Sequence, residues 1–348
     1  MINVITICLM KKIYLKNGHT SKRSKPVNLK TEDEKLFVHE FQKYINNSYY
    51  VIKKNLYIKN YDIYKFKYFL SDFENTKMSK YSRTIMIKKI IKELLQQKPL
   101  QNSEDIETGI WCLDEKSFHY FHWFCDSLAR YVEIIEKKES RPLLISSQLY
   151  DIEFVRDSLK MLNIDYIVYE NNKLHKVNNL MISSHIAESG NFSNKNINKL
   201  SKMLKDAVVA DEMSDPKRNI WVSRNKSKHR KIFNEEKLLN LLNRYNFEII
   251  YPEDISFSEQ LKIYKNTNIL GGLHGGGLTN ILFMNEGTNL IEIRRKGDDA
   301  NNCYFTLASE LKINYYYLES NSLGDDLYIS NVEINEKELE RVLSEATG

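Results

Sequence analysis

A glycine-rich stretch constrains this sequence more than any other feature. Five of the chain's 12 glycines fall between residues 271 and 277, after the apolar pair Ile269-Leu270 and before the apolar residues Leu278, Ile281 and Leu282. This pattern predicts a strand, a tight turn and then a helix. The first N–H groups of a helix have no partner within it, and the helix dipole is positive at that end. A phosphate or diphosphate can therefore bind at such a turn, and glycines allow it to come close.

A second apolar run, residues 290–293, follows the glycines and contains Glu292. A carboxylate inside a buried strand is costly unless it finds hydrogen-bond partners. At the carboxyl end of a strand, ribose hydroxyls would be suitable partners. The same residues also fit a structural glycine turn followed by an exposed glutamate. Strand-to-helix turns rich in glycine often carry phosphates, which favours nucleotide binding.

Length and composition indicate a soluble globular protein with room for two domains. The chain has 348 residues, of which 28% are charged and 42% hydrophobic. The net charge of +5 favours an anionic ligand or an anionic lipid surface, and we find no nucleic-acid-reading module. The four cysteines show no paired spacing, which predicts a reducing, cytoplasmic compartment. Residues 1–10 are apolar but too short to span a membrane, so we expect a strand or a peripheral membrane contact.

Strand and helix patterns alternate over residues 109–186 and again over 219–318. This rhythm predicts an α/β protein with two Rossmann-like halves built from parallel βαβ units. We place domain limits at 1–100, 101–213, 214–330 and 331–348, the last being a terminal helix. The expected helices lie at 82–97, 117–137, 152–162, 194–209, 235–244, 258–265, 304–311 and 336–346. Ligands bind outside the carboxyl ends of the strands in such sheets, which here predicts the cleft between the halves.

The predicted helix from Ser117 carries a candidate acid–base pair. An apolar stripe on one face contains Phe118, Phe121, Cys125, Leu128 and Val132. A different face carries His119, His122, Asp126 and Arg130. Because His122 and Asp126 are four residues apart, Asp126 can orient His122 as a general base. A solvated helix face is an equal alternative, and a metal site using His119, His122, Cys125 and Asp126 would need ligands from two faces.

A basic segment follows the predicted strand at 219–223. Ser223 and Arg224 end that strand, so Arg224 can reach a ligand in the cleft and form bidentate bonds to phosphate. The loop that follows contains Arg230 and several lysines. A solvated charged loop is the simpler interpretation of Lys226, Lys228 and Lys231.

These segments together resemble glycosyltransferase family 61. The resemblance rests on the block from His274 to Asn280, followed by Phe283-Met284, Gly287-Thr288 and Glu292. It extends to Ser223-Arg224 with Arg230, and to His122-Trp123 with Cys125-Asp126. Gly276 replaces the alanine usual in the family, and His119 stands where the family usually has asparagine.

The resemblance implies a GT-B fold, with two Rossmann-like domains facing a central cleft, and an inverting glycosyltransferase. Residues 1–100 and 101–213 would then form the acceptor half, and 214–330 the nucleotide-sugar half. The catalytic pair would be His122 and Asp126. The residues expected to bind the donor are Ser223, Arg224, Arg230, His274, Gly275, Gly276, Gly277, Thr279, Asn280 and Glu292.

We expect the donor to be a UDP-sugar, and the acceptor to be an oligosaccharide or lipid-linked saccharide of a bacterial capsule or surface polysaccharide. Since the second half contains no Asp-x-Asp motif, we expect no metal, and the enzyme would be cytoplasmic or peripheral at the inner membrane face. Two alternatives remain: a nucleotide-sugar epimerase or hydrolase, and a non-catalytic nucleotide-binding assembly subunit. The glycine spacing argues against an NAD-dependent oxidoreductase.

Overall fold

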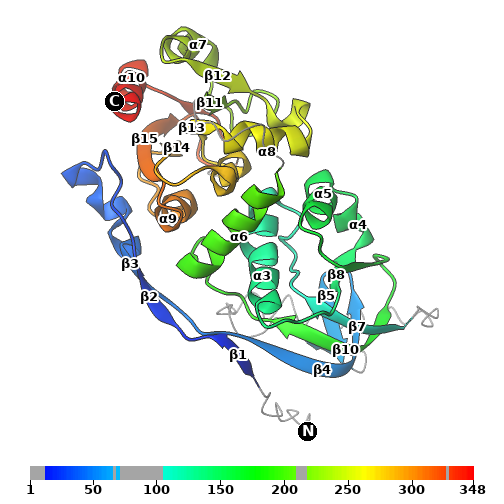
Figure 1. The fold of residues 1–348 in the computed structure, drawn as a ribbon. Coiled ribbons are helices and arrows are strands. Elements are labelled where there is room, and N and C mark those ends of the chain that lie inside the picture. The colour runs from blue at the N-terminus through cyan, green and yellow to red at the C-terminus, as the bar shows by residue number, and fades with distance from the viewer. Residues whose placement is uncertain (1–11, 66–67, 71–104, 209–217, 327–328) are drawn as a thin grey trace. The chain divides into compact units, whose positions relative to one another are not determined.

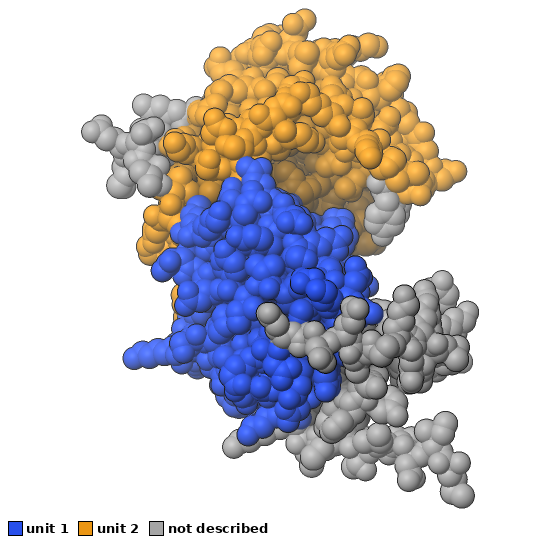
Figure 2. All heavy atoms as spheres, turned by 90° about the vertical axis from the view of Figure 1, so that its right-hand side faces the viewer, with its two compact units in different colours: residues 1–19, 46–188 blue, residues 20–45, 189–348 orange. Residues whose placement is uncertain are grey.

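The structure is a computed structural model that describes residues 12–65, 68–70, 105–208, 218–326 and 329–348. The chain forms two compact units, one from residues 1–19 and 46–188 and one from residues 20–45 and 189–348. Figure 2 colours the two units separately. The domain limit predicted near residue 213, the helix at 82–97 and the apolar segment 1–10 lie outside the described residues.

The first unit is built on a mixed sheet with the order β6-β5-β4-β10-β7-β8-β9, and β1 also pairs with β4. Figure 1 labels β1, β4, β5, β7, β8 and β10 of this sheet. Strands β10, β7, β8 and β9 run parallel, whereas β4 is antiparallel to β10. The strands are β1 (Ile13–Lys16), β4 (Ser48–Lys59), β5 (Asp62–Lys65), β6 (Tyr68–Leu70), β7 (Ile106–Trp111), β8 (Leu143–Ser146), β9 (Tyr166–Tyr169) and β10 (His175–Ser183). The helices are α2 (Tyr120–His122), the π-helix η3 (Trp123–Leu128), α3 (Ala129–Ile135), α4 (Ser147–Tyr150) and α5 (Glu153–Met161).

The second unit contains a sheet with the order β12-β11-β13-β14-β15-β16, parallel except for β16. Its strands are β11 (Arg218–Val222), β12 (Phe247–Ile250), β13 (Thr267–Leu273), β14 (Asn289–Arg295), β15 (Asn314–Ser322) and β16 (Val332–Glu333). Its α-helices are α6 (Asn194–Ala207), α7 (Glu235–Arg244), α8 (Phe257–Lys265), α9 (Cys303–Glu310) and α10 (Glu336–Thr347). Short 3-10 helices are η1 (Thr31–Leu36), η2 (Val38–Glu40), η4 (Pro252–Asp254) and η5 (Gly276–Phe283), and β2 (His19–Lys22) pairs with β3 (Gln42–Ile45).

Alternation along the strands of the second unit sorts its side chains onto two faces. Ile291 and Ile293 of β14 belong to the buried core formed with α7 and α10, together with Leu238 and Val342. Glu292 lies between them and points to the opposite face. The charged side chain of Glu292 therefore lies on a buried face of the sheet.

The compact units differ from the predicted domain limits at two places. Helix α6 lies in the second unit, where the Ser201 hydroxyl donates to the Leu282 carbonyl at 2.7 Å. Residues 20–45 also join this unit, since the Val27 N–H donates to the Tyr315 carbonyl at 2.8 Å. Both differences come from contacts between segments far apart in sequence. The local sequence pattern of each segment does not show such contacts.

Candidate functional site

The sheet of the second unit has a topological switch point between β11 and β13. After β11 the chain passes through α7 to β12 on one side, and then returns to place β13 on the other side of β11. In parallel sheets, ligands bind outside the carboxyl ends of the strands at such a point. Ser223 and Arg224 follow β11, and His274 and the remaining glycines follow β13. The structure therefore brings the two predicted donor-binding segments to one edge.

Arg224 crosses the glycine turn at this edge. Its Nε donates to the Arg230 carbonyl at 3.0 Å and its Nη2 donates to the Ser227 hydroxyl at 3.2 Å, which orders the basic loop. A Cβ atom at Gly275 would lie 2.5 Å from Nη1 of Arg224. Gly275 is thus needed for the close approach of this guanidinium to the turn. Burial lowers the pKa of Arg224, and the positive charge of Arg230 lowers it further.

Two further glycines of this stretch allow close packing against β11. A Cβ atom at Gly271 would lie 2.7 Å from the Trp221 ring, and one at Gly277 would lie 2.8 Å from a Val222 methyl group. The helix predicted after the turn is present as the 3-10 helix η5. Gly276 and Gly277 are its first two residues.

Three of the predicted donor-binding residues are buried behind the edge. The Ser223 hydroxyl donates to Glu235 at 2.5 Å, and Asn280 donates to the Gly277 carbonyl at 2.9 Å. Thr279 is fully buried. In this structure Ser223 and Asn280 order the turns around the site, and direct contact of these three residues with a donor stays a prediction.

Glu292 is also buried, with none of its surface exposed. One carboxylate oxygen contacts Nδ1 of His274, and the other accepts a hydrogen bond from the Tyr315 hydroxyl at 2.6 Å. Tyr315 in turn accepts from Arg294 at 3.2 Å. Glu292 therefore fixes the ring of His274, and the alternative of an exposed glutamate is wrong. The expected contact with a ribose stays a prediction, since protein groups are the partners observed here.

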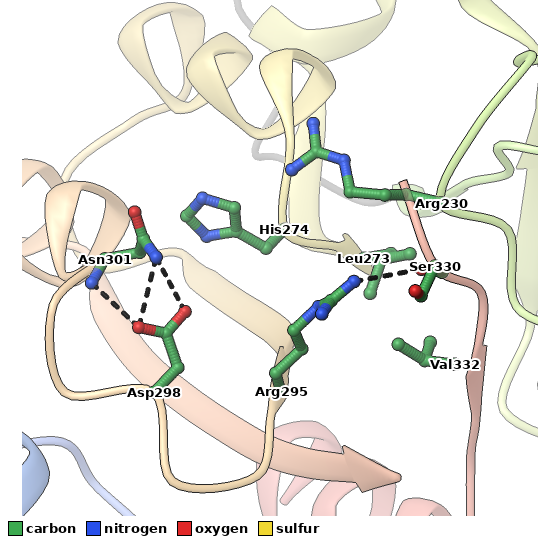
Figure 3. A pocket seen from close by; sticks show the side chains of 8 residues that line it. All are labelled: Arg230, Leu273, His274, Arg295, Asp298, Asn301, Ser330 and Val332. Carbon is green, nitrogen blue, oxygen red and sulfur yellow. Dashed lines mark hydrogen bonds between the residues drawn. The ribbon is translucent and has the colours of Figure 1, made fainter. Parts of the chain in front are cut away.

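A pocket opens beside these residues (Figure 3). Side chains of Arg230, His274 and Arg295 extend into it from different sides, and Asp298 and Asn301 form another part of its wall. The full lining consists of Arg230, Leu273, His274, Arg295, Asp298, Asn301, Ser330 and Val332. Both oxygens of Asp298 accept hydrogen bonds from Asn301, the shorter at 2.8 Å. Arg295 was not predicted from the sequence, although it ends the strand β14 next to the glycine turn, much as Arg224 follows β11.

Arg230 adopts a backbone conformation that is unusual for its residue type. Its φ is +56°, in the left-handed region that costs most L-residues about 1–2 kcal/mol. Its N–H donates to the Ile329 carbonyl at 3.2 Å, which helps to hold this conformation. Strained residues of this kind concentrate at functional sites.

The first unit holds the predicted acid–base pair. Nδ1 of His122 lies 2.7 Å from a carboxylate oxygen of Asp126, so the predicted contact is present. His122 is partly exposed, whereas Asp126 is buried. The helix changes to a π-helix directly after His122, a feature that often marks functional sites. The alternative of a solvated helix face is wrong for Asp126 and Arg130, because both side chains are buried. Phe118 was expected on the apolar stripe, but it is exposed.

Two further residues surround this pair at the carboxyl ends of β7 and β10. Asp114 follows β7 and accepts from Arg130 at 2.8 Å, while His185 follows β10 with its Nε2 3.7 Å from the Asp114 carboxylate. Burial would raise the pKa of Asp114, but Arg130 and His185 outweigh it and the pKa is lowered. The Arg130 charge, followed by burial, lowers the pKa of His185 to about 4, so this ring is neutral at pH 7. Neither residue was found from the sequence.

The described part of the chain contains neither a cluster of metal ligands nor a membrane-spanning helix. No three side chains among His, Cys, Asp and Glu are grouped there as a metal site would require. None of the helices described has the length and apolar character needed to cross a membrane. Whether the reaction needs a metal stays a prediction.

Comparison with known proteins shows which protein family this part of the chain is similar to. Residues 120–291 match the profile of the family described as Glycosyltransferase 61. The chain carries a glycosyltransferase 61 domain. This domain includes the pair His122 and Asp126 as well as Arg224, Arg230 and the glycine turn.

The similar proteins are named EGF domain-specific O-linked N-acetylglucosamine transferases. The Drosophila melanogaster protein is 35% identical over 101 residues, which cover 28% of this chain and 19% of that protein. The Bos taurus protein is 34% identical over 94 residues, covering 26% and 18%, and the Mus musculus protein is 32% identical over 113 residues, covering 31% and 21%. The matches thus span about a fifth of the length of these curated relatives.

Proposed function

We propose that this chain is an inverting glycosyltransferase that moves a sugar from a UDP-sugar to a saccharide acceptor. The observation that carries the proposal is the arginine-lined pocket at the switch point of the second sheet, to which the matched glycosyltransferase 61 segment contributes Arg230, Leu273 and His274. Arginine forms bidentate bonds to phosphate and keeps its charge at any physiological pH. Arg224 and Arg230 would hold the diphosphate, with the N–H groups at the start of η5 aiding them.

In the proposed mechanism, His122 is the general base. Its Nδ1 is bonded to Asp126, which leaves Nε2 to take the proton of an acceptor hydroxyl. The acceptor oxygen then forms a bond to the anomeric carbon as the bond from that carbon to the diphosphate breaks. The leaving diphosphate takes the electron pair, and the arginines stabilise its growing charge. One displacement of this kind inverts the anomeric configuration.

This mechanism requires the two units to face one cleft, as in the GT-B arrangement, and we include that arrangement in the proposal. What supports it is that each unit carries its polar groups at the carboxyl ends of its parallel strands. We also propose that the acceptor belongs to a bacterial capsule or surface polysaccharide, built on the cytoplasmic side. The names of the relatives make UDP-N-acetylglucosamine the first donor to test.

Calorimetry on the purified protein tests the proposal. We expect UDP to bind, with affinity that survives EDTA, and to bind more tightly than GDP, CMP or NAD. Incubation with UDP-sugars and saccharide acceptors should then yield a product of inverted configuration. Binding of NAD alone would contradict the donor assignment, and release of a free sugar without an acceptor would indicate a hydrolase or epimerase. Binding without turnover would favour an assembly subunit.

A further inference from the structure

Arg295 has a buried guanidinium nitrogen that is not satisfied. Its Nη2 donates to the carbonyls of Asp326 and Ser330, at 3.1 and 3.0 Å. Its Nη1 is buried and finds no hydrogen-bond acceptor among the residues that the structure describes. The residue is only 8% exposed and lines the pocket. An unpaired buried charged donor is costly, so a missing acceptor is the simplest physical explanation.

The surroundings of Nη1 indicate what kind of acceptor is missing. Arg230 lines the same pocket, and both side chains extend into it (Figure 3). Burial lowers the pKa of Arg295, and the charge of Arg230 lowers it further. Two like charges held together in this way are stabilised by an anion between them. The acidic member of the wall, Asp298, is directed to Asn301 by its hydrogen bonds.

The neighbouring Arg294 shows that burial alone does not make such a site. It too has a buried nitrogen, Nε, without an acceptor in the described part of the chain. Its guanidinium lies 4.7 Å from the centre of the Phe37 ring and bonds to Asn302 at 2.9 Å. Arg294 is on the opposite face of β14 and does not line the pocket, whereas Arg295 does.

We propose that Arg295, acting with Arg230, binds the terminal phosphate of a nucleoside diphosphate, which makes this pocket a pyrophosphate site. The inference rests on the proposed function and deepens it, because it names the part of the donor that the pocket takes. Arg224 at the glycine turn is then left to contact the phosphate nearer the nucleoside. The fixed Nη2 bonds to Asp326 and Ser330 mean that Arg295 is already oriented before the ligand arrives.

Calorimetry with three ligands tests this assignment: UDP, UMP and inorganic pyrophosphate. In Arg295→Gln we expect UDP and pyrophosphate affinity to fall about tenfold to a hundredfold, as for loss of a charged hydrogen bond. UMP affinity should change less than about twofold, because UMP lacks the terminal phosphate. Arg295→Lys keeps the charge and should recover part of the loss. The charge-matched control is Arg244→Gln, an exposed arginine of α7 that should alter none of the three affinities.

The outcomes separate this inference from the proposed function. If UDP binds but Arg295→Gln leaves its affinity unchanged in a folded protein, the inference is wrong and the function stands. If UDP binds through Arg295 but no UDP-sugar is turned over with any acceptor, the proposed transferase function is wrong and the inference stands. A third comparison uses UDP-glucuronate and UDP-glucose: a loss confined to UDP-glucuronate would show that Arg295 binds a sugar carboxylate, which contradicts the phosphate assignment. Circular dichroism and thermal melting establish that each variant is folded.

Discussion

The buried carboxylate of Glu292 determines how His274 is presented to the pocket. An isolated carboxylate without exposed surface would be strongly destabilising. Glu292 instead receives donors on both oxygens, from His274 and from Tyr315, and Arg294 bonds to the same tyrosine. Burial and the nearby charge of Glu292 raise the pKa of Tyr315 well above its usual value, so it remains a hydrogen-bond donor. With Nδ1 fixed in this way, only Nε2 of His274 is left for a ligand.

The role of His122 can be tested by replacement of either member of its pair. We expect His122→Gln to lower kcat about 10²- to 10⁴-fold, the usual contribution of a general base. Asp126→Asn should also lower kcat, because an amide that donates to Nδ1 would leave the proton on the wrong nitrogen. Steady-state kinetics with a UDP-sugar and calorimetry with UDP provide the measurements.

UDP affinity is the readout that separates catalysis from damage to the fold. Both variants should bind UDP within about twofold of the unchanged protein, since every group assigned to the diphosphate lies in the other unit. His19→Gln, which removes an exposed histidine from β2, is the control and should leave kcat unaltered. Undiminished turnover in His122→Gln would remove this residue from the base role.

At the scale of elements, Gly271 in β13 and Gly275 in the turn before η5 should respond differently to the same substitution. Gly275→Ala places a methyl group against the flexible end of Arg224, which can move away at little cost in stability. Gly271→Ala places it against the rigid Trp221 ring, which should destabilise the protein by about 1–3 kcal/mol. We therefore expect weaker UDP binding with a nearly unchanged melting temperature for Gly275→Ala, and a lowered melting temperature for Gly271→Ala. If both variants lost UDP affinity and melting temperature to the same extent, the separate roles assigned to Gly275 and Gly271 would be wrong.

Most of the alternating elements could be predicted because their hydrophobic periods are clear. Strands β11 and β14 lie where the sequence predicted them, at 219–223 and around the apolar run 290–293. Strand β10 was missed, although it is central to the first sheet, because Asn178 and Asn179 interrupt its apolar residues. These asparagines bond to Glu107 of β7, a partner that cannot be identified without the sheet order.

The candidate site was predictable only in part, for a related reason. His122 and Asp126 were found because a spacing of four residues reports a local contact on a helix. Arg295, Asp114 and His185 join their sites through contacts between distant segments. Their sequence neighbourhoods resemble ordinary strand ends, so only the strand order shows that they meet other functional groups.

At the scale of the whole molecule, the groups assigned to the diphosphate fall in one of the two units. The sheet of the second unit packs against α7 and α10 through residues that are all its own. Arg224, Arg230, Arg295 and His274 also all belong to this unit. UDP without a sugar should therefore stabilise the second unit alone, because a ligand stabilises only the structure that must unfold to release it.

Hydrogen exchange followed by mass spectrometry can measure this effect unit by unit. At a UDP concentration one hundred times Kd, binding contributes about 2.7 kcal/mol, which slows exchange through global opening about a hundredfold. We expect this slowing in the most protected amides of β11, β13 and β14, and none in those of β7, β8 and β10. Arg224→Ala at the same UDP concentration should abolish the difference. If the slowest amides of both sheets gained equal protection, the chain would open as one cooperative body, and this measurement could not assign UDP binding to the second unit.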